Sequence, residues 1–490
     1  MNHITGIPRE QITMFPEAID DYISPENPVR FLDAFVDSLD SITLGFEHAV
    51  VSDTGRPPYH PKDLLKLYLY GYLNRIRTSR LLERETKRNL ELFWLLKRLS
   101  PDHKTIADFR TNNADPLRDV FRHFVQTCQK LSLFSNELVA VDSTKFKAHN
   151  ARDRVKDAQG LDKSIASISE SIARYFQQLD ENDAADETAT PPELTKEQLQ
   201  EKIFALSEEK AKLGEAKTQL KQTDEKYVSL TDPDCRLIKD RHGIEPAYRM
   251  QTAVDSKHSL IVDYQLTNDA ADNNHLSRMA TAARETLGVK YLTVCADAGY
   301  YDTVDVKNCE DNQITTYMPV PEPKISKKKN VPKPEYYYDK FTYDKASDTY
   351  RCPQGQILQY YTRKVKSDGR HIRIYWAGKD ACTNCPARLK EECTTSPRGR
   401  YIHRWEHENV LERLRERLGQ TAGRNIIKRR KEIVEHPFGV LKSIWGYRAF
   451  LLKGLRKVRS EAALMNLIYN IRRAITIIGT KRLIAHLESG

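Results

Sequence analysis

The chain has 490 residues, enough for roughly two to four domains, and 39% of them are hydrophobic, so sizeable cores can form. We expect no membrane span, because no run of about 18 apolar residues occurs, and no secretory signal peptide at the start. A net charge of +10 favours a polyanionic partner without proving one. The absence of a G-x-x-x-x-G-K-[ST] loop argues against a nucleotide cofactor.

Residues 1–133 are predicted to form a helical domain. Apolar side chains recur at helical spacing over residues 64–70, and Ser100-Pro101-Asp102 is typical of a helix start. Lys and Arg side chains are frequent between Arg75 and Arg98. This pattern fits a DNA-binding helical domain, and on charge alone it fits an ordinary charged helix surface equally well.

The next region combines one strand with a helical insert. Residues 137–145 form an apolar, β-rich run in which Asp142 marks the end of a predicted buried strand. Between residues 156 and 228, apolar side chains recur at steps of three, four and seven residues on both sides of a polar, acidic connector. These steps predict two helices with a coiled-coil seam, folded as an antiparallel hairpin insert or paired between subunits.

Strands and helices alternate after the hairpin. The predicted elements are strands at 248–254 and 259–266, a helix at 273–287 capped by Asp272, a strand at 291–297, a helix at 303–312 and a strand at 314–318. Asp297 is the last residue of the third of these strands.

A second insert, residues 319–420, precedes the C-terminal helices. It begins with a linker rich in proline and lysine and continues as a β-rich segment with half of the eight cysteines. Helices are predicted over residues 424–441 and 460–478. With both inserts set aside, the order of elements predicts an α/β fold with a mixed sheet.

Three acids occupy informative places in this order. Asp142 and Asp297 end predicted strands, and Glu435 lies on a helix where it and Glu432 are the only acids among many cations. Strand ends meet at one edge of an open sheet, where active sites form. Carboxylates there suit two Mg²⁺ or Mn²⁺ ions, which promote phosphodiester cleavage. A single aspartate at a strand end more often caps a turn, so the three acids count only as a set.

Short motifs recur in a fixed order along nearly the whole chain. They are Arg56-Pro-Pro-Tyr-His-Pro61, Leu69-Tyr-Gly-Tyr72, Ser79-Arg80, Ser100-Pro-Asp-His-Lys-Thr-Ile-Ala-Asp-Phe-Arg110, Val141-Asp-Ser-Thr-Lys145, Asp297-Ala-Gly-Tyr300, Val434-Glu-His-Pro-Phe-Gly439 with Lys442, Glu461 and Tyr469-Asn470. In this order they resemble the DDE transposases of bacterial insertion sequences, specifically the insertion sequence 1182 group, which is related to the insertion sequence 4 superfamily. Each motif is weak alone, and their order is specific.

The resemblance implies a ribonuclease-H-like catalytic core, made of residues 134–155, 229–318 and 421–490. It implies that Asp142, Asp297 and Glu435 form the acidic triad that holds two Mg²⁺ or Mn²⁺ ions. The implied reaction is hydrolysis of a phosphodiester at the transposon end, followed by attack of the freed 3′-hydroxyl on target DNA. The implied partners are double-stranded DNA, as inverted-repeat ends and as target, and a second copy in a homodimeric synaptic complex. The implied location is the bacterial cytoplasm, in association with the nucleoid.

A related group carries a Tyr-Arg-Glu-Lys signature around its glutamate. Glu435 and Lys442 have its spacing, about two helical turns apart on one face. The arginine of the signature falls at Lys431 here, and its tyrosine falls at Lys428. Glu432, one turn earlier, is therefore the alternative third ligand. We prefer Glu435, because a lysine on the same face can hold a DNA phosphate beside the metals.

Basic side chains of the core and of the helical domain are the predicted contacts with DNA phosphates: Lys145, Arg110, Arg430, His436, Lys442 and Arg448. Trp445 lies among them. Packing in the core is the first interpretation of this tryptophan, and stacking on an unpaired base is the second.

Four cysteines of the second insert form a pattern of their own: Cys352, Cys382, Cys385 and Cys393. The Cys382-x-x-Cys385 pair is its strongest element, and four thiolates suit a tetrahedral Zn²⁺ that would organise the insert. Free thiols are the alternative, and a disulfide is less favoured in a reducing compartment.

Two other functions compete with transposition. One is a non-catalytic, domesticated DNA-binding regulator, which binds DNA without cutting it. The other is an interaction scaffold built on the coiled coil. The acidic triad argues against both.

Overall fold

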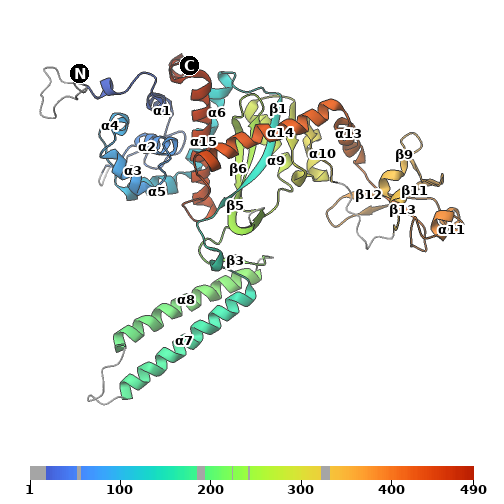
Figure 1. The fold of residues 1–490 in the computed structure, drawn as a ribbon, viewed down its shortest axis with the longest axis horizontal. Helices are drawn as coiled ribbons and strands as arrows, with labels where there is room; N and C mark the ends of the chain where they lie inside the picture. Colours follow the sequence, from blue (N-terminus) through green and yellow to red (C-terminus); the bar gives the residue numbers. More distant parts are fainter. Residues whose placement is uncertain are drawn as a thin grey trace, which may run out of the picture. The chain divides into compact units, whose positions relative to one another are not determined.

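The computed structural model describes residues 18–51, 57–184, 194–222, 225–240, 243–321 and 331–489 (Figure 1). Arg56, which begins the first motif, lies outside these residues. The chain divides into two compact units. Unit 1 comprises Met1–Asp272, Ala282–Val289 and Glu432–Gly490, and unit 2 comprises Asn273–Thr281 and Lys290–Lys431. These units differ from the four predicted regions, and each is described by itself.

Unit 1 begins with a bundle of helices: α1 (Pro28–Asp37), α2 (Pro61–Leu73), α3 (Ser79–Thr86), α4 (Leu90–Leu95), α5 (His103–Asn112) and α6 (Ala114–Lys130). Polar side chains cap several of them. Asn27 accepts the Val29 amide at the start of α1, where Pro28 takes the first helical position. Asp102 accepts two amides at the start of α5, as the sequence predicts.

The sheet of unit 1 is antiparallel and is built around the long strand β5 (Gly243–Asp255). β1 (Leu138–Lys147) pairs along one edge of β5, with Asp142 opposite Thr252. β4 (Arg236–Asp240) and β6 (Ile261–Thr267) pair with successive halves of the other edge. The first four residues of β1 are all buried, which is why they read as a continuous apolar run.

α15 (Leu455–Ile478) is the central helix of unit 1. Every residue from Ser460 to Ile471 is buried, and the helix contacts α2, α5, α6 and β6. A helix that is buried on every face lies inside its domain rather than on the surface. Asn470 exchanges two hydrogen bonds with the backbone of Ile261, and the Tyr469 hydroxyl donates to the Ser259 carbonyl at 2.6 Å. The Tyr469-Asn470 motif therefore anchors this helix to β6.

The first insert is a helical hairpin, in which α7 (Ala158–Ala184) and α8 (Lys196–Gln222) run antiparallel (Figure 1). Near its base, Leu161, Leu213 and Leu220 form a buried cluster. Further along the hairpin Phe204 is 67% exposed. Leu199, toward the other end of the hairpin, is 1% exposed, so three of these four buried leucines lie near the base.

Unit 2 contains a parallel pair of strands, β7 (Leu292–Ala296) and β8 (Ile314–Tyr317), joined through α10 (Thr303–Asp311). α13 (Glu408–Gly419) contacts α10 and β8, and Glu310 pairs with Arg413 and Arg417 of α13. α14 (Thr421–Gly439) begins in unit 2 and ends in unit 1.

The second insert folds as a five-stranded antiparallel sheet in the order β13-β12-β11-β10-β9. Its strands are β9 (Thr342–Asp344), β10 (Thr349–Arg351), β11 (Ile357–Val365), β12 (His371–Trp376) and β13 (Tyr401–Trp405). The short helices α11 (Lys379–Thr383) and α12 (Pro386–Leu389) carry the Cys382-x-x-Cys385 segment. Phe341, Tyr350, Leu358, Tyr375 and Ile402 form its core.

The predicted cap at Asp272 is wrong. The helix that should follow it, α9 (Leu276–Leu287), begins four residues later. The Asp272 carboxylate instead accepts from Arg249 at 2.8 Å and from Gln251 at 2.9 Å, both on β5. A long-range ion pair thus replaces the local cap.

No helix among the described residues is long and apolar enough to span a membrane.

Candidate catalytic and DNA-binding residues

Asp142 was predicted to end its strand. It lies instead in the middle of β1. The strand continues to Lys147, because residues beyond Asp142 also pair with β5, beginning with Ser143 opposite Gln251. The end of the apolar run was mistaken for the end of the strand. The Asp142 side chain is half-buried, and its Oδ1 accepts the Ser143 amide at 2.8 Å. This bond orients one carboxylate oxygen.

Asp297 directly follows β7, where the sequence places it. Its Oδ1 accepts the Ala298 amide at 2.7 Å and so caps a short 3-10 helix (Ala298–Tyr300). The side chain is exposed, whereas Tyr300 in the same motif is buried. Asp297 belongs to unit 2, and the other two predicted acids belong to unit 1.

Glu435 and its alternative, Glu432, both lie near the end of α14 with exposed side chains. Ile433 and Val434 between them are buried. Exposure therefore does not separate the two glutamates, and the choice of Glu435 stays a prediction.

The helix changes its winding between Glu435 and Lys442. α14 ends at Gly439, and Val440–Ile444 form a π-helix. Each turn of a π-helix contains more residues than an α-turn, so the interval from Glu435 to Lys442 is not two regular α-helical turns. A proline inside α14, Pro437, precedes this change.

Lys442 is bonded within the protein. Its ammonium donates to the carbonyl oxygen of Lys145 and lies 4.8 Å from the centre of the Phe146 ring. It thereby holds β1 three residues beyond Asp142. Lys145 is only 10% exposed and donates to Glu245 at 3.3 Å. The predicted phosphate contacts of both lysines compete with these internal bonds.

The segment after the π-helix runs beside the end of β1. The Lys147 amide donates to the Arg448 carbonyl at 3.1 Å, and the Phe450 amide donates to the Lys147 carbonyl at 2.9 Å. The Arg448 side chain is exposed, so a contact with DNA remains a prediction for it. Trp445 is half-buried with its ring 5.7 Å from that of Tyr447, which agrees with the packing interpretation.

Arg110 does not lie where DNA can reach it. Its side chain is 4% exposed and donates to the Arg77 carbonyl at 3.0 Å and to the Tyr72 hydroxyl at 3.3 Å. Burial raises the pKa of Tyr72 to about 12, so this phenol remains neutral beside the cation. The prediction that Arg110 contacts DNA is not supported, because the motif holds the helical bundle together.

His436 is likewise engaged inside unit 1. Its Nδ1 lies 2.8 Å from the Tyr469 hydroxyl, whose own proton goes to the Ser259 carbonyl. His436 Nδ1 must therefore donate. Burial, and then Arg473, lower the pKa of His436, which favours the neutral ring. This position suits a structural anchor better than the predicted phosphate contact. Arg430 is half-buried on the part of α14 in unit 2, and its predicted contact with DNA stays a prediction.

Among the residues that the structure describes, no three His, Cys, Asp or Glu side chains are grouped so as to hold a metal ion. A formed zinc centre is therefore not supported. The four predicted cysteines nevertheless line one cavity of about 30 Å³ in unit 2. Its wall also contains Arg400, whose buried Nε has no hydrogen-bond partner in the described chain.

The backbone packs closely around two of the thiols that line this cavity. The Gln356 amide donates to Cys352 Sγ at 3.2 Å, and Gly355 has a φ of +82° that favours glycine. A Cβ on Gly399 would come within 2.9 Å of Cys382 Sγ, so no larger residue fits there without movement. Burial raises the pKa of Cys393 to about 11, which keeps its thiol protonated when no metal is bound.

The sheet of the second insert presents a basic and aromatic face that the sequence analysis missed. The rings of Tyr361, Trp376 and Tyr401 lie 5.2 to 6.1 Å apart, and Tyr361 is 56% exposed. Cross-strand pairing places Lys364 of β11 and His403 of β13 on the same face. Residues 357–405 contain eleven Lys or Arg against four Asp or Glu, a net charge of +7. A bulge between Tyr360 and Thr362 hides the alternation of this face in the sequence.

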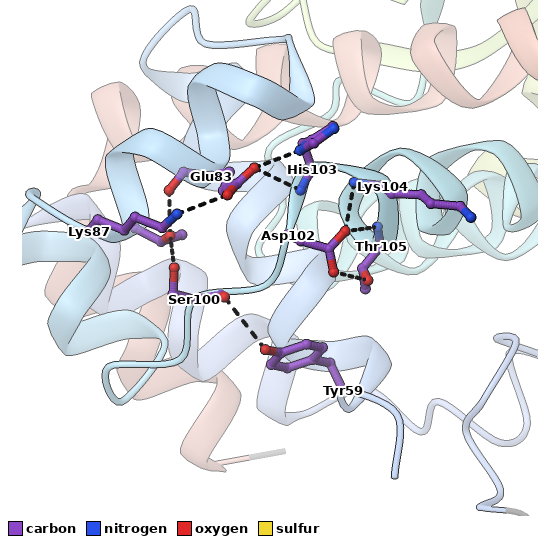
Figure 2. Close-up of polar contacts among 9 residues, drawn as sticks. Tyr59, Glu83, Lys87, Ser100, Asp102, His103, Lys104 and Thr105 are labelled. Carbon is purple, nitrogen blue, oxygen red and sulfur yellow. Dashed lines mark hydrogen bonds and ion pairs between the residues drawn. The ribbon is translucent and has the colours of Figure 1, made fainter. Parts of the chain in front are cut away.

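A cluster of polar contacts fixes the start of α5 against α3 in the helical bundle (Figure 2). Glu83 accepts the backbone amide of His103 at 3.0 Å, lies 2.8 Å from its ring nitrogen, and accepts from Lys87 at 2.8 Å. These bonds, with that from Lys87 the strongest, lower the pKa of Glu83 to about 2. Lys104, directly after His103 in the first turn of α5, is exposed. The start of α5 is thus fixed in the bundle, with the cations Lys87 and Lys104 nearby.

Two protein-family models match the chain. A transposase domain (DUF772) matches residues 17–112, and a transposase DDE domain matches residues 351–475. These two matches support a DDE transposase. Such a domain implies a ribonuclease-H-like core and the use of divalent metal ions. The second match includes Glu435 and excludes Asp142 and Asp297, so it supports the class of enzyme and leaves the triad unidentified.

No curated protein matches the sequence. Among solved structures, the cryo-EM structure of the piggyBac transposase synaptic complex with hairpin DNA matches with 9% identity, over 94% of this chain and 85% of that chain. Its TM-score is 0.25, so this similarity carries no argument about the fold or the function of this chain.

Proposed function

We propose that this transposase binds the terminal inverted repeats of an insertion sequence of the 1182 group, hydrolyses a phosphodiester at each end and joins the freed 3′-hydroxyl to target DNA. The observation that carries the proposal is the match of a transposase DDE domain over residues 351–475. The net charge of +10 and the absence of a nucleotide-binding loop from the sequence agree with a reaction on DNA that needs no nucleotide.

Asp142, Asp297 and Glu435 are the proposed ligands for two Mg²⁺ or Mn²⁺ ions. When bound, such ions activate the attacking oxygen and stabilise the leaving oxygen of the phosphodiester. The donor chemistry fits, because hard divalent cations prefer carboxylate oxygens. The described side chains are not grouped around a metal position as they stand. The fit therefore rests on the type of donor, and it is the triad as a set that needs testing.

Residues around Asp142 orient this proposed metal ligand and fix its strand. The Ser143 amide orients its Oδ1, and Arg249 donates to the Ser143 hydroxyl at 2.9 Å from the paired strand. Lys442 fixes the backbone of β1 at Lys145. These bonds hold the ligand strand in place, and they leave the exposed Arg448 nearby for a DNA phosphate.

DNA binding is proposed for two described surfaces, the start of α5 with its neighbouring cations and the basic, aromatic face of the second insert. The first lies within the transposase domain matched over residues 17–112. The second belongs to a segment, residues 357–405, with a net charge of +7, and its Tyr361 ring is exposed. Positive charge is the general requirement for contact with the phosphate backbone. We also propose a homodimer, because joining two transposon ends requires two active sites in one complex.

Zinc is proposed as a structural ion in the second insert. Four thiols line one cavity, a backbone amide already points at Cys352 Sγ, and the buried Arg400 lacks a partner for its Nε. Thiolates on zinc would provide the negative charge that this guanidinium needs, whereas neutral thiols would not. The ion would hold the insert together and take no part in the reaction.

The proposal is tested by incubating the protein with DNA that carries the native element's ends, with Mg²⁺ or Mn²⁺. Asp142→Ala, Asp297→Ala and Glu435→Ala should each lower the cleavage rate by about 1,000-fold or more, because a metal ligand supports several kcal/mol of transition-state stabilisation. Glu432→Ala is the matched control on the same helix and should keep most of the activity. Cleavage that survives in the three variants would refute the triad. Wild-type protein that binds ends and never cuts would instead be a non-catalytic regulator.

A further inference from the structure

A chain of buried polar contacts in unit 1 leads from the helical bundle to the strand that carries Asp142. It begins at Arg77, in the connection between α2 and α3, whose side chain is 13% exposed. Both terminal nitrogens of its guanidinium donate to the Ala449 carbonyl, at 3.1 and 3.0 Å. The same guanidinium lies 4.6 Å from the centre of the Tyr447 ring. The Arg77 side chain thus binds the segment that follows the π-helix, residues 447–452 (the gripped segment).

Other residues of the helical bundle fix the backbone of Arg77. The buried Arg110 donates to the backbone carbonyl of Arg77 and to the hydroxyl of Tyr72 on α2. The Tyr447 hydroxyl donates to the Tyr72 carbonyl at 2.6 Å, so the gripped segment also bonds directly to α2. These groups are nearly or completely buried, and hydrogen bonds in such surroundings have little competition from water.

The gripped segment is in turn bonded to β1. Ala449 forms a parallel bridge with Lys147, through the amides of Lys147 and Phe450. The rings of Phe146 and Phe450 lie 5.3 Å apart. Arg77 is therefore bonded to Ala449, and the segment around Ala449 is bonded to β1, the strand that carries the proposed metal ligand Asp142.

A buried glutamate of α15 fixes the far end of the same segment. Glu461 is completely buried and accepts the amides of Leu451 and Leu452, at 2.9 and 2.7 Å. Its carboxylate also lies 4.0 Å from Arg77. Arg77 is thus the point where the bundle, the segment after the π-helix and the central helix meet.

We propose that Arg77 is a positioning residue for DNA cleavage, which couples the DNA-binding helical bundle to β1 through residues 447–452. The inference rests on the proposed function for its catalytic readout. A direct contact of Arg77 with DNA is disfavoured, because its side chain is only 13% exposed and both terminal nitrogens donate to the Ala449 carbonyl. Loss of the guanidinium would leave the Ala449 carbonyl without these donors and Glu461 without its nearby cation.

The test compares Arg77→Ala and Arg77→Lys with Arg122→Ala, a control that removes an equal charge from α6, where Arg122 pairs with nearby Asp119 at 3.1 Å. Single-turnover cleavage at saturating end DNA should fall roughly 10- to 100-fold in Arg77→Ala, as expected for a misplaced metal ligand. Its Kd for end DNA should stay within about threefold of wild type. Arg77→Lys should recover part of the rate, because a lysine still reaches the carbonyl but lacks the fork.

Hydrogen exchange supplies a readout that needs no cleavage. In wild-type protein, binding of end DNA should slow exchange of the Lys147 and Phe450 amides, and in Arg77→Ala this protection should be lost. Should Arg77→Ala fail to fold, Tyr447→Phe carries the same test, because it removes only the hydroxyl that bonds to α2.

The inference is overturned if Arg77→Ala weakens binding as much as cleavage, which would make Arg77 a DNA contact. It is also overturned if cleavage and exchange are both unchanged. If wild-type protein never cleaves, the proposed function fails, and the exchange experiment alone decides the coupling.

Discussion

The two inserts of this protein are opposite in charge and in architecture. The helical hairpin, residues 158–222, carries eight Lys or Arg against thirteen Asp or Glu, a net charge of −5, in a chain of net charge +10. The sheet of the second insert carries +7 within residues 357–405. The hairpin is packed around leucines, whereas the second insert combines an aromatic core with a cysteine-lined cavity.

The contrast separates two tasks. DNA repels the acidic hairpin and attracts the basic sheet, so the second insert is the one that suits a DNA contact. The hairpin, which is made of two antiparallel helices and has most of its buried side chains at one end, suits a spacer or a contact with protein.

Metal removal should have the largest effect, and only on the second insert. Cys385→Ser, or prolonged chelation, should unfold the five-stranded sheet, because apparent binding free energies of structural zinc reach about 10 kcal/mol or more. Hydrogen exchange of β12 and β13 should then approach that of an unfolded chain, while α7 and α8 keep their protection. Protein purified without zinc and with a protected sheet would show that the insert needs no ion.

Leu213→Ala should loosen the hairpin and nothing else. The side chain is 4% exposed within the cluster near the hairpin base, so its truncation should cost about 2–4 kcal/mol of local stability. Hydrogen exchange of α7 and α8 measures this loss. Phe204→Ala, at an exposed position of the same hairpin, should change it by less than about 0.5 kcal/mol. A weaker affinity for DNA in Leu213→Ala would contradict the separation of tasks.

Reversing two charges should weaken DNA binding only in the second insert. Lys364→Glu with Lys366→Glu should lower the affinity for end DNA about 10-fold and should reduce the salt dependence by roughly two phosphate contacts. The matched reversal on the hairpin, Lys210→Glu with Lys212→Glu, should change the affinity by less than about twofold. All four lysines are exposed, so folding is not at issue. Equal losses in both variants would remove the distinction between the inserts.

The smallest expected effect is a pH dependence of DNA binding through His403. Partial burial, and then Lys366, Arg400 and Lys364, lower the pKa of His403 below its usual 6.5. The ring is therefore neutral near pH 7 and gains a charge only as the pH falls through this lowered value. The affinity for DNA should rise by about two- to threefold over that range, and His403→Gln should abolish the rise. The stability contributed by neutral His403 is present above pH about 6.5 and is lost as the pH falls.

The sequence predicted local features well and long-range ones poorly. Asp297 follows its strand as expected, because a mostly apolar run, Leu292–Ala296, marks that strand clearly. Asp142 lies inside its strand, because the polar residues after it are held by pairing with β5, which no local pattern records. Asp272 is not a cap, because Arg249 of that same distant strand takes its carboxylate.

The candidate DNA contacts show the same limit. Arg110 and His436 count as cations in the sequence, yet both are engaged inside unit 1 by partners more than 30 residues away. Charge composition does not reveal burial. Conversely, the basic and aromatic face of the second insert was missed, because its residues come from three strands and gather only when the sheet forms.

The all-round burial of α15 has a consequence for how the protein folds. Residues 460–471 contact α2, α6 and β6, and Arg77 bonds to a residue 372 positions later in the chain. Contacts with such long sequence separation form late and slow the search for the native state. On the ribosome, the helical bundle and the sheet, which end at Lys130 and Thr267, emerge long before the helix that begins at Leu455 and completes their shared core. Nascent chains that lack α15 should therefore expose apolar surface and be degraded, which would couple the appearance of active protein to complete translation.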